Sequence, residues 1–124
     1  MHIDHINISA PMKLLEKVRD FYCEVLGLNE GFRPNFSKNG FWLYADGKPI
    51  IHLSESPGHD VGEKQGYIDH FALKATGVES VIEKLENAGI GYRTSYVPEI
   101  SLTQVFCKDP SGTGVEINFL KEPV

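Results

Sequence analysis

Two histidines in this 124-residue chain stand at the same place in a short phrase that occurs twice. The run Ile3-Asp4-His5 near the start returns as Ile68-Asp69-His70, and the residues after each histidine stay apolar at corresponding positions. A phrase that recurs in this way indicates two copies of one structural unit, each with a histidine in its first strand. Two imidazoles related by a pseudo-twofold axis can converge on one point, and imidazole is a common ligand of divalent metals.

A third histidine and a glutamate stand at matching places near the end of each copy. In the run Ile50-Ile51-His52-Leu53, strand alternation places the aliphatic side chains on one face and the histidine on the other. In Val115-Glu116-Ile117-Asn118-Phe119, the apolar residues leave Glu116 and Asn118 on the opposite face. A lone histidine in a strand is usually a hydrogen-bonded, half-buried residue, but four metal-competent side chains in register favour a metal site. We therefore predict four metal ligands, which are His5, His52, His70 and Glu116. The remaining histidines, His2 and His59, are expected on the surface.

Hydrophobic periodicity predicts the same order of elements in both copies, which is one strand, one helix and three further strands. One helix is expected over Lys13–Leu26, where Gly27 follows as a stop signal, and another over about 78–88. The segment 55–66, which contains proline and glycine, is expected to be a linker. Strands are expected at 2–9, about 28–34, 41–45 and 48–54, and again at 67–75, about 91–97, 102–108 and 113–119.

This order predicts an α+β fold: a single domain over 1–124, made of two βαβββ modules at about 1–55 and 66–120. One helix per module can cover only one face of its sheet, so each helix is expected on the outside. The two uncovered faces are expected to form a cup-shaped, partly open mixed β-sheet barrel. A cavity in that cup is the natural place for a small ligand.

Composition narrows the classes of function. The net charge is −5 and the sequence has no cluster of Lys and Arg, which argues against a nucleic-acid partner. No apolar run approaches the ~20 residues of a membrane span, and the first residues lack the pattern of a signal peptide. We therefore expect a cytoplasmic protein with no membrane partner, in which Cys23 and Cys107 are reduced thiols.

Four segments together resemble the vicinal oxygen chelate superfamily, also called the glyoxalase/bleomycin-resistance/dioxygenase superfamily. They are Asp4–Ile8, Phe21–Leu28, Asp69–Leu73 and Asp109–Ile117. The resemblance implies the two-module fold, and it implies ligands on the first and last strand of each module, the same four residues as above. Glyoxalase I usually carries a glutamate at the place of His52 and uses it in proton transfer. The remaining three, His5, His70 and Glu116, are similar to the two-histidine, one-carboxylate pattern of extradiol dioxygenases and fosfomycin-modifying members.

The resemblance implies a metal-dependent enzyme that acts on a small molecule with vicinal oxygens, as a lyase or isomerase or as an extradiol-type dioxygenase. One divalent ion per site is expected, Fe(II), Mn(II), Ni(II) or Zn(II), because nitrogen and oxygen ligands alone do not choose among them. Glu116 and His52 are the candidate catalytic proton acceptors. The alternative is a non-catalytic, ligand-sequestering protein of the bleomycin-resistance type, whose members bind their drug without metal ligands.

Other residues are candidates for contact with the substrate: Asn7, Trp42, Tyr44, Gln104, Phe106 and Asn118. Trp42 and Tyr44 share the face of His52 if the hairpin loop is Ala45-Asp46-Gly47, which we favour. A two-residue loop would put Phe41 and Leu43 there instead. Two arginines, Arg33 and Arg93, are expected either in exposed salt bridges or on an anionic group of the substrate.

The chain is expected to form a homodimer, because open cups leave sheet edges and apolar rims to cover. Small members of the resembled family also usually pair. Whether each site is built within one chain or across two is left open.

Overall fold

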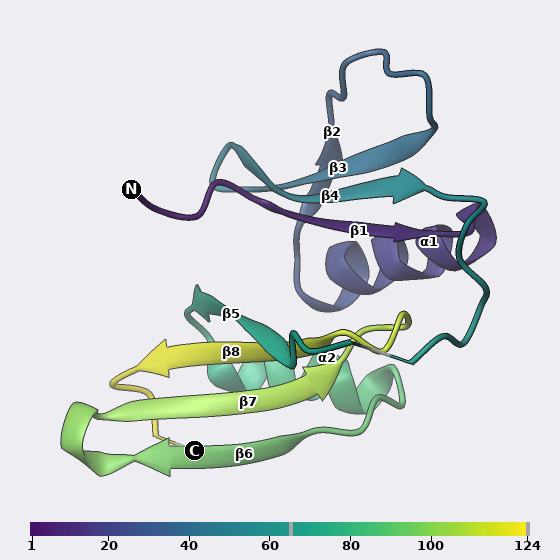
Figure 1. The fold of residues 1–124 in the computed structure, drawn as a ribbon. Helices are drawn as coiled ribbons and strands as arrows, with labels where there is room; N and C mark the ends of the chain where they lie inside the picture. Colours follow the sequence, from purple (N-terminus) through teal and green to yellow (C-terminus); the bar gives the residue numbers. More distant parts are fainter. Residues whose placement is uncertain (65, 124) are drawn as a thin grey trace. The chain divides into compact units, whose positions relative to one another are not determined.

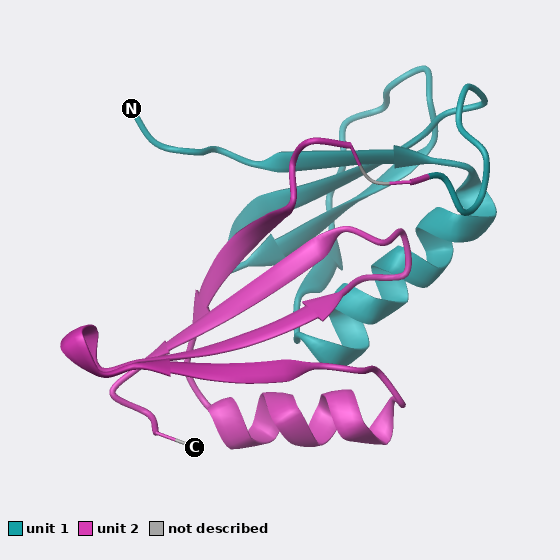
Figure 2. Cartoon of the chain, turned by 60° about the horizontal axis from the view of Figure 1, so that its bottom comes forward, with its two compact units in different colours: residues 1–63 teal, residues 64–124 magenta. Residues whose placement is uncertain are grey.

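A computed structural model describes residues 1–64 and 66–123 of the chain. The chain divides into two compact units, unit 1 (Met1–Glu63) and unit 2 (Lys64–Val124), which Figure 2 draws in different colours. Each unit holds one four-stranded sheet with one α-helix along a single face (Figure 1). The α+β class and the βαβββ order are therefore confirmed. In the part of the chain that is described, no helix is long and apolar enough to span a membrane.

Unit 1 contains β1 (Ile6–Ala10), α1 (Met12–Asp20), the π-helical turn η1 (Phe21–Val25), β2 (Asn29–Gly31), β3 (Gly40–Ala45) and β4 (Lys48–Glu55). Its strand order is β1-β4-β3-β2, and β1 runs parallel to β4. The first strand starts later than predicted, so His5 precedes it. The predicted strand over 28–34 keeps only three residues, since the chain leaves the sheet before Pro34, which has no N–H for a ladder.

The core of unit 1 lies between its helical segment and its sheet. Leu15, Val18, Tyr22 and Val25 are buried at helical spacing, and Leu43, Ile51 and Leu53 are fully buried beneath them. We call the face opposite the helix the open face of the sheet. Because side chains alternate along a strand, burial of Ile51 and Leu53 sends His52 to the open face.

The turn between β3 and β4 is shorter than predicted, but Trp42 still shares the face of His52, as expected. Ala45 pairs with Lys48, so the loop is the two-residue Asp46-Gly47, both with positive φ (52° and 77°), and the expected three-residue loop is wrong. A bulge between Leu43 and Tyr44 then shifts the register by one residue, so that Trp42 still lies opposite His52.

Unit 2 contains β5 (His70–Ala75), α2 (Val78–Asn87), β6 (Arg93–Val97), the 3₁₀ turn η2 (Pro98–Ile100), β7 (Leu102–Lys108) and β8 (Gly114–Leu120). Its strand order is β5-β8-β7-β6, the same as in unit 1, again with first and last strands parallel. The strand predicted from residue 67 begins at His70. Gln65, inside the predicted linker, lies outside the described residues.

The core of unit 2 follows the alternation of β7 and β8. Val105, Val115, Ile117 and Phe119 are at most 1% exposed, and Leu85 of α2 is fully buried. Glu116 and Asn118 alternate with these residues along β8 and lie on the open face of the sheet, as predicted.

Helix α2 has no capping side chain in its own sequence. Its N-cap is Gly77, and the carboxylate of Glu122 supplies the cap from beyond β8. Oε1 of Glu122 accepts hydrogen bonds from the backbone N–H groups of Gly77 and Val78, both at 2.9 Å. The negative charge also complements the positive end of the helix dipole.

Replacing this cap should destabilise the protein. We expect Glu122→Ala to lower the free energy of unfolding by ~1 kcal/mol, since two backbone donors lose their acceptor. Chemical denaturation measures the change. Glu99→Ala, at an exposed position of η2, should shift it by less than about 0.5 kcal/mol. Equal effects of the two substitutions would contradict the capping role.

A second prediction concerns the buried thiol of Cys107. Burial, with a smaller contribution from Asp109, raises its pKa from 9.0 to about 11. The folded state therefore holds this proton more tightly, and the associated stability is complete below pH 9 and is lost as the pH rises toward 11. The free energy of unfolding should fall by ~2 kcal/mol across this window through Cys107. Denaturation of Cys107→Ala should show a shallower decline, and parallel curves would refute the assignment.

Candidate functional site

Two of the four predicted ligands, His5 and His52, are neighbours in unit 1. Their rings are stacked, with centroids 3.7 Å apart and planes inclined by 13°. Trp42 stacks on the other side of His52, at 4.0 Å and 12°. The register Trp42↔His52 across β3 and β4 produces the second of these contacts.

The stack disfavours protonation of His52. Burial lowers its pKa, and the neighbouring His5 lowers it further. Its Nε2 lies 3.1 Å from the backbone oxygen of Pro49. When Nε2–H donates to that carbonyl, Nδ1 carries the lone pair and can accept a proton or a hydrogen bond.

Each repeated Asp-His phrase forms the same hydrogen bond. His5 Nδ1 lies 2.7 Å from Asp4 Oδ2, and His70 Nδ1 lies 2.8 Å from Asp69 Oδ2. These hydrogen bonds are the largest cause of the lowered pKa of Asp4 and of Asp69. A carboxylate on Nδ1 fixes the tautomer and orientation of an imidazole and directs Nε2 outward as the metal-binding nitrogen.

The other two predicted ligands, His70 and Glu116, meet in unit 2. His70 Nε2 lies 3.1 Å from Glu116 Oε1, and Glu116 is 8% exposed. The second carboxylate oxygen, Oε2, accepts a hydrogen bond of 3.1 Å from Gln104 Nε2. The hydrogen bond that His70 Nδ1–H donates to the Asp69 carboxylate, helped by the charge of Glu116, raises the pKa of His70. This pair therefore attracts positive charge, whether a proton or a metal cation.

Strand register makes the sites of the two units equivalent. Asn7 lies opposite His52 in the β1–β4 pair, and Ala72 lies opposite Glu116 in the β5–β8 pair. Gly114, opposite His70, must be glycine, because a Cβ would lie 2.4 Å from the backbone oxygen of Asp69.

The remaining predicted site residues have varied surroundings. Asn7 donates to the hydroxyls of Ser9 and Ser54 on the open face of unit 1. Tyr44 donates to the Phe32 carbonyl and does not line the pocket beside His52. Asn118 has a buried Oδ1 with no hydrogen-bond partner among the described residues.

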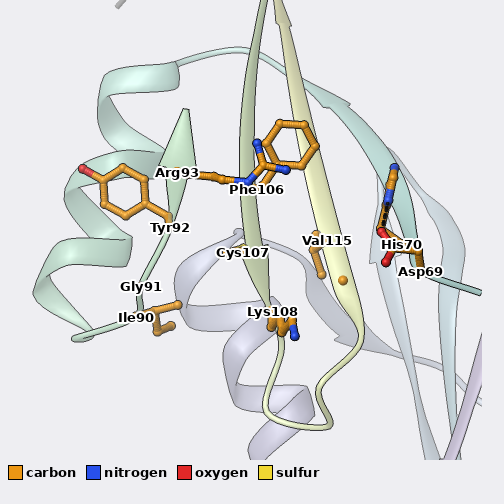
Figure 3. Close-up of a pocket in the computed structure, with 11 residues that line it drawn as sticks. Asp69, His70, Ile90, Gly91, Tyr92, Arg93, Phe106, Cys107, Lys108 and Val115 are labelled. Atoms are coloured by element: carbon orange, nitrogen blue, oxygen red, sulfur yellow. Dashed lines mark hydrogen bonds and ion pairs between the residues drawn. The ribbon is translucent and has the colours of Figure 1, made fainter. Parts of the chain in front are cut away.

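Phe106 and Arg93 line a pocket of about 570 Å³ in unit 2, beside Asp69 and His70 (Figure 3). The Phe106 ring meets His70 edge to face at 6.3 Å, and the Arg93 guanidinium lies 3.9 Å over the same ring. A volume of this size suits a small organic ligand.

Salt bridges of Arg33 and Arg93, one of the two alternatives expected for these residues, are not found among the described residues. Within residues 1–64 and 66–123, neither Arg33 nor Arg93 pairs with a carboxylate, and each instead stacks on a phenylalanine. Sequence reasoning missed the nearby Lys38 and Lys108, which line the pockets of units 1 and 2. Lys108 could have been found, because it alternates with Gln104 and Phe106 on the same strand face.

Neither pair of ligands completes a metal site within its own unit. Over the described residues, no group of three or more His, Cys, Asp or Glu side chains could hold a metal ion. The chemistry of the donors nevertheless fits a divalent metal, because both Asp-His pairs are oriented and the Glu116 carboxylate is held in place by Gln104.

The fold is shared with several solved structures. A protein assigned to the glyoxalase family from Bacillus anthracis is 22% identical, with a TM-score of 0.76 over 98% of this chain and 96% of that one. A glyoxylase/bleomycin resistance protein/dioxygenase domain from Frankia sp. EAN1pec is 17% identical, with a TM-score of 0.79 and coverages of 100% and 95%. No curated protein matches the sequence significantly.

A third solved structure is a mutant of the fosfomycin resistance protein FosX from Listeria monocytogenes, in complex with Mn(II) and 1S,2S-dihydroxypropylphosphonic acid. It is 15% identical, with a TM-score of 0.67, and the match covers 99% of this chain and 94% of that one. Similarities at these identities establish the fold alone. The sequence profile of one family, however, matches residues 2–117. The chain belongs to the Glyoxalase/Bleomycin resistance protein/Dioxygenase superfamily.

Proposed function

We propose that the protein is a metal-dependent enzyme that acts on a small molecule with vicinal oxygens. His5, His70 and Glu116 would hold one divalent cation. The observation that carries the proposal is the repeated pair in which an aspartate fixes Nδ1 of a histidine, since this is how proteins orient imidazole for a metal.

The donor set suits several cations. Two imidazole nitrogens and one carboxylate leave coordination positions open and are compatible with Fe(II), Mn(II), Ni(II) or Zn(II). Among the structural neighbours, FosX was crystallised with Mn(II) and a vicinal diol, which supports this class of cation and substrate. His5 belongs to unit 1, and His70 and Glu116 belong to unit 2. The protein is proposed to act as a homodimer.

His52 is assigned as a neighbour of the metal site rather than as a fourth ligand. The His5 and His52 rings are stacked nearly parallel with centroids 3.7 Å apart, an arrangement that does not aim their nitrogens at one point. Binding through both would require one ring to turn and break its stack or its contact with Pro49. His52 instead supports the His5 ring and offers Nδ1 as a proton acceptor.

The residues divide the chemistry among them. A divalent ion held by His5, His70 and Glu116 would supply Lewis-acid chemistry to a substrate with vicinal oxygens. Glu116 lowers the net charge of the centre, and together with His52 it is a candidate to move a proton. Gln104 holds one oxygen of that carboxylate, and Phe106 provides an apolar wall. Both lyase or isomerase chemistry and extradiol-type dioxygenation use such a centre.

Removing the carboxylate should weaken metal binding. Glu116→Gln keeps the size of the side chain and its contact with Gln104, so the fold should persist. We expect its affinity for Mn(II) or Zn(II) in calorimetry to fall by at least ~10-fold, because the charge and one donor are lost. Glu99→Gln removes the same charge at an exposed site and should bind like the wild type.

Unchanged metal affinity in Glu116→Gln would contradict the proposal that Glu116, with His5 and His70, binds a divalent metal. A ligand-sequestering protein of the bleomycin-resistance type would then be the better reading, and binding to peptide and aromatic drugs would be measured next.

The outer carboxylates give a separate test. Asp4→Asn and Asp69→Asn should each weaken metal affinity by roughly 10–100-fold while leaving the ligands in place. Asn can present its amide N–H to Nδ1 and favour the wrong tautomer, which is the physical reason for the loss. Calorimetry on both variants checks this, with Asp46→Asn in the β3–β4 turn as the control. Wild-type affinity in both would contradict the orienting role.

A further inference from the structure

The pocket of unit 1 carries positive charge that metal binding does not use. It has a volume of about 270 Å³, and residues of the loop between β2 and β3 and of the sheet line it. Figure 1 shows this loop and the sheet as a ribbon. Two cations, two aromatic rings and several neutral polar groups line it, among them Arg33, Lys38, Phe36, Trp42, Asn7 and Ser54. His52 borders the same pocket and connects it to the stack with His5.

The guanidinium of Arg33 is fixed before any ligand arrives. Its Nη1 donates to the Lys38 carbonyl at 3.0 Å, and its Cζ lies 4.9 Å over the Phe36 ring. Gly40 leaves room for it, because a Cβ there would lie 3.0 Å from Nη2 and 2.0 Å from the Leu53 carbonyl. A side chain immobilised in this way loses little entropy when it binds.

The charge of this pocket is unbalanced. Its lining contains no Asp or Glu, and in the described part of the chain neither Arg33 nor Lys38 makes a salt bridge. The nearby Glu55 carboxylate instead lies 3.5 Å from the Asn39 amide. Among residues 1–64 and 66–123, Arg33 Nε is a buried donor without a hydrogen-bond partner. In a chain of net charge −5, two unpaired cations around one pocket suit an anionic ligand.

We propose that this pocket binds the oxyanion group, a carboxylate or a phosphonate, of a small organic molecule whose apolar part packs on Phe36 and Trp42. Arg33 and Lys38 neutralise the anion, and the neutral donors of Asn7 and Ser54 lie at the same pocket. That this anion belongs to the substrate of the metal centre rests on the proposed function; the anion site itself does not.

Trp42 provides a direct readout, because it is the only tryptophan in the chain. Its single indole N–H resonance can be followed by NMR in metal-free protein kept in chelator. Benzoate and phenylphosphonate should shift it saturably, and the tighter of the two identifies the anion. Benzamide has nearly the shape of benzoate without its charge and should bind about tenfold more weakly or not at all.

Charge-removing variants complete the test. Lys38→Gln should weaken binding by about tenfold while keeping the backbone carbonyl that Arg33 uses, and Arg33→Gln should weaken it at least as much. Lys13→Gln, on the exposed side of α1, should have no effect. Equal binding of benzamide and benzoate, no saturable shift, or equal losses in Lys13→Gln and Lys38→Gln would overturn the proposal.

The two proposals can fail separately. Glu116→Gln should retain anion binding in unit 1, because that residue belongs to unit 2 and the titration contains no metal. Loss of metal affinity as predicted with no anion binding rejects only the anion site. Anion binding without any metal affinity in the wild type rejects only the metal enzyme.

Discussion

Parallel pairing of the first and last strand in each unit is the constraint on which the rest of the structure depends. It sets Asn7 beside His52 and Ala72 beside Glu116. It also brings the segment that contains His5 next to β4, which carries His52, and the segment that contains His70 next to β8, which carries Glu116. A slip of one residue would turn Ile51 or Ile117 outward and bury His52 or Glu116 in the core. Burial of Ile51 and Ile117 therefore keeps His52 and Glu116 on the open faces of their sheets.

The two units share this framework but differ in electrostatics. In unit 1 the pKa of His52 is lowered, and the surrounding pocket carries Arg33 and Lys38. In unit 2 the pKa of His70 is raised by Asp69 and Glu116. Duplicated backbones have thus been given opposite preferences, one for negative charge and one for positive charge.

Much of the fold was predictable because periodicity and turn chemistry are local. Asp46-Gly47 indicated its hairpin, and the alternation around His52 and Glu116 indicated their face. The bulge after Leu43 was not predictable, because it depends on how two strands pair rather than on either sequence. The same holds for the cap on α2, whose acceptor, Glu122, lies 44 residues after the Val78 N–H it accepts from. In the candidate site, the grouping of His5 with His52 and of His70 with Glu116 could be predicted from strand alternation. The stacking of Arg33 on Phe36 could not, because it depends on the conformation of a loop.

The strand order also dictates when each half of the protein can fold. Because β1 pairs with β4, unit 1 has all its strands once Glu55 has been synthesised, and it can close while the remainder is still being translated. Unit 2 cannot close its sheet until β8 is available, since β5 pairs with β8 in the described sheet of that unit. During this interval the apolar side of β5 is unpaired and exposed. Unit 1 can therefore fold first, whereas unit 2 remains for longer in a state that is prone to misassociation.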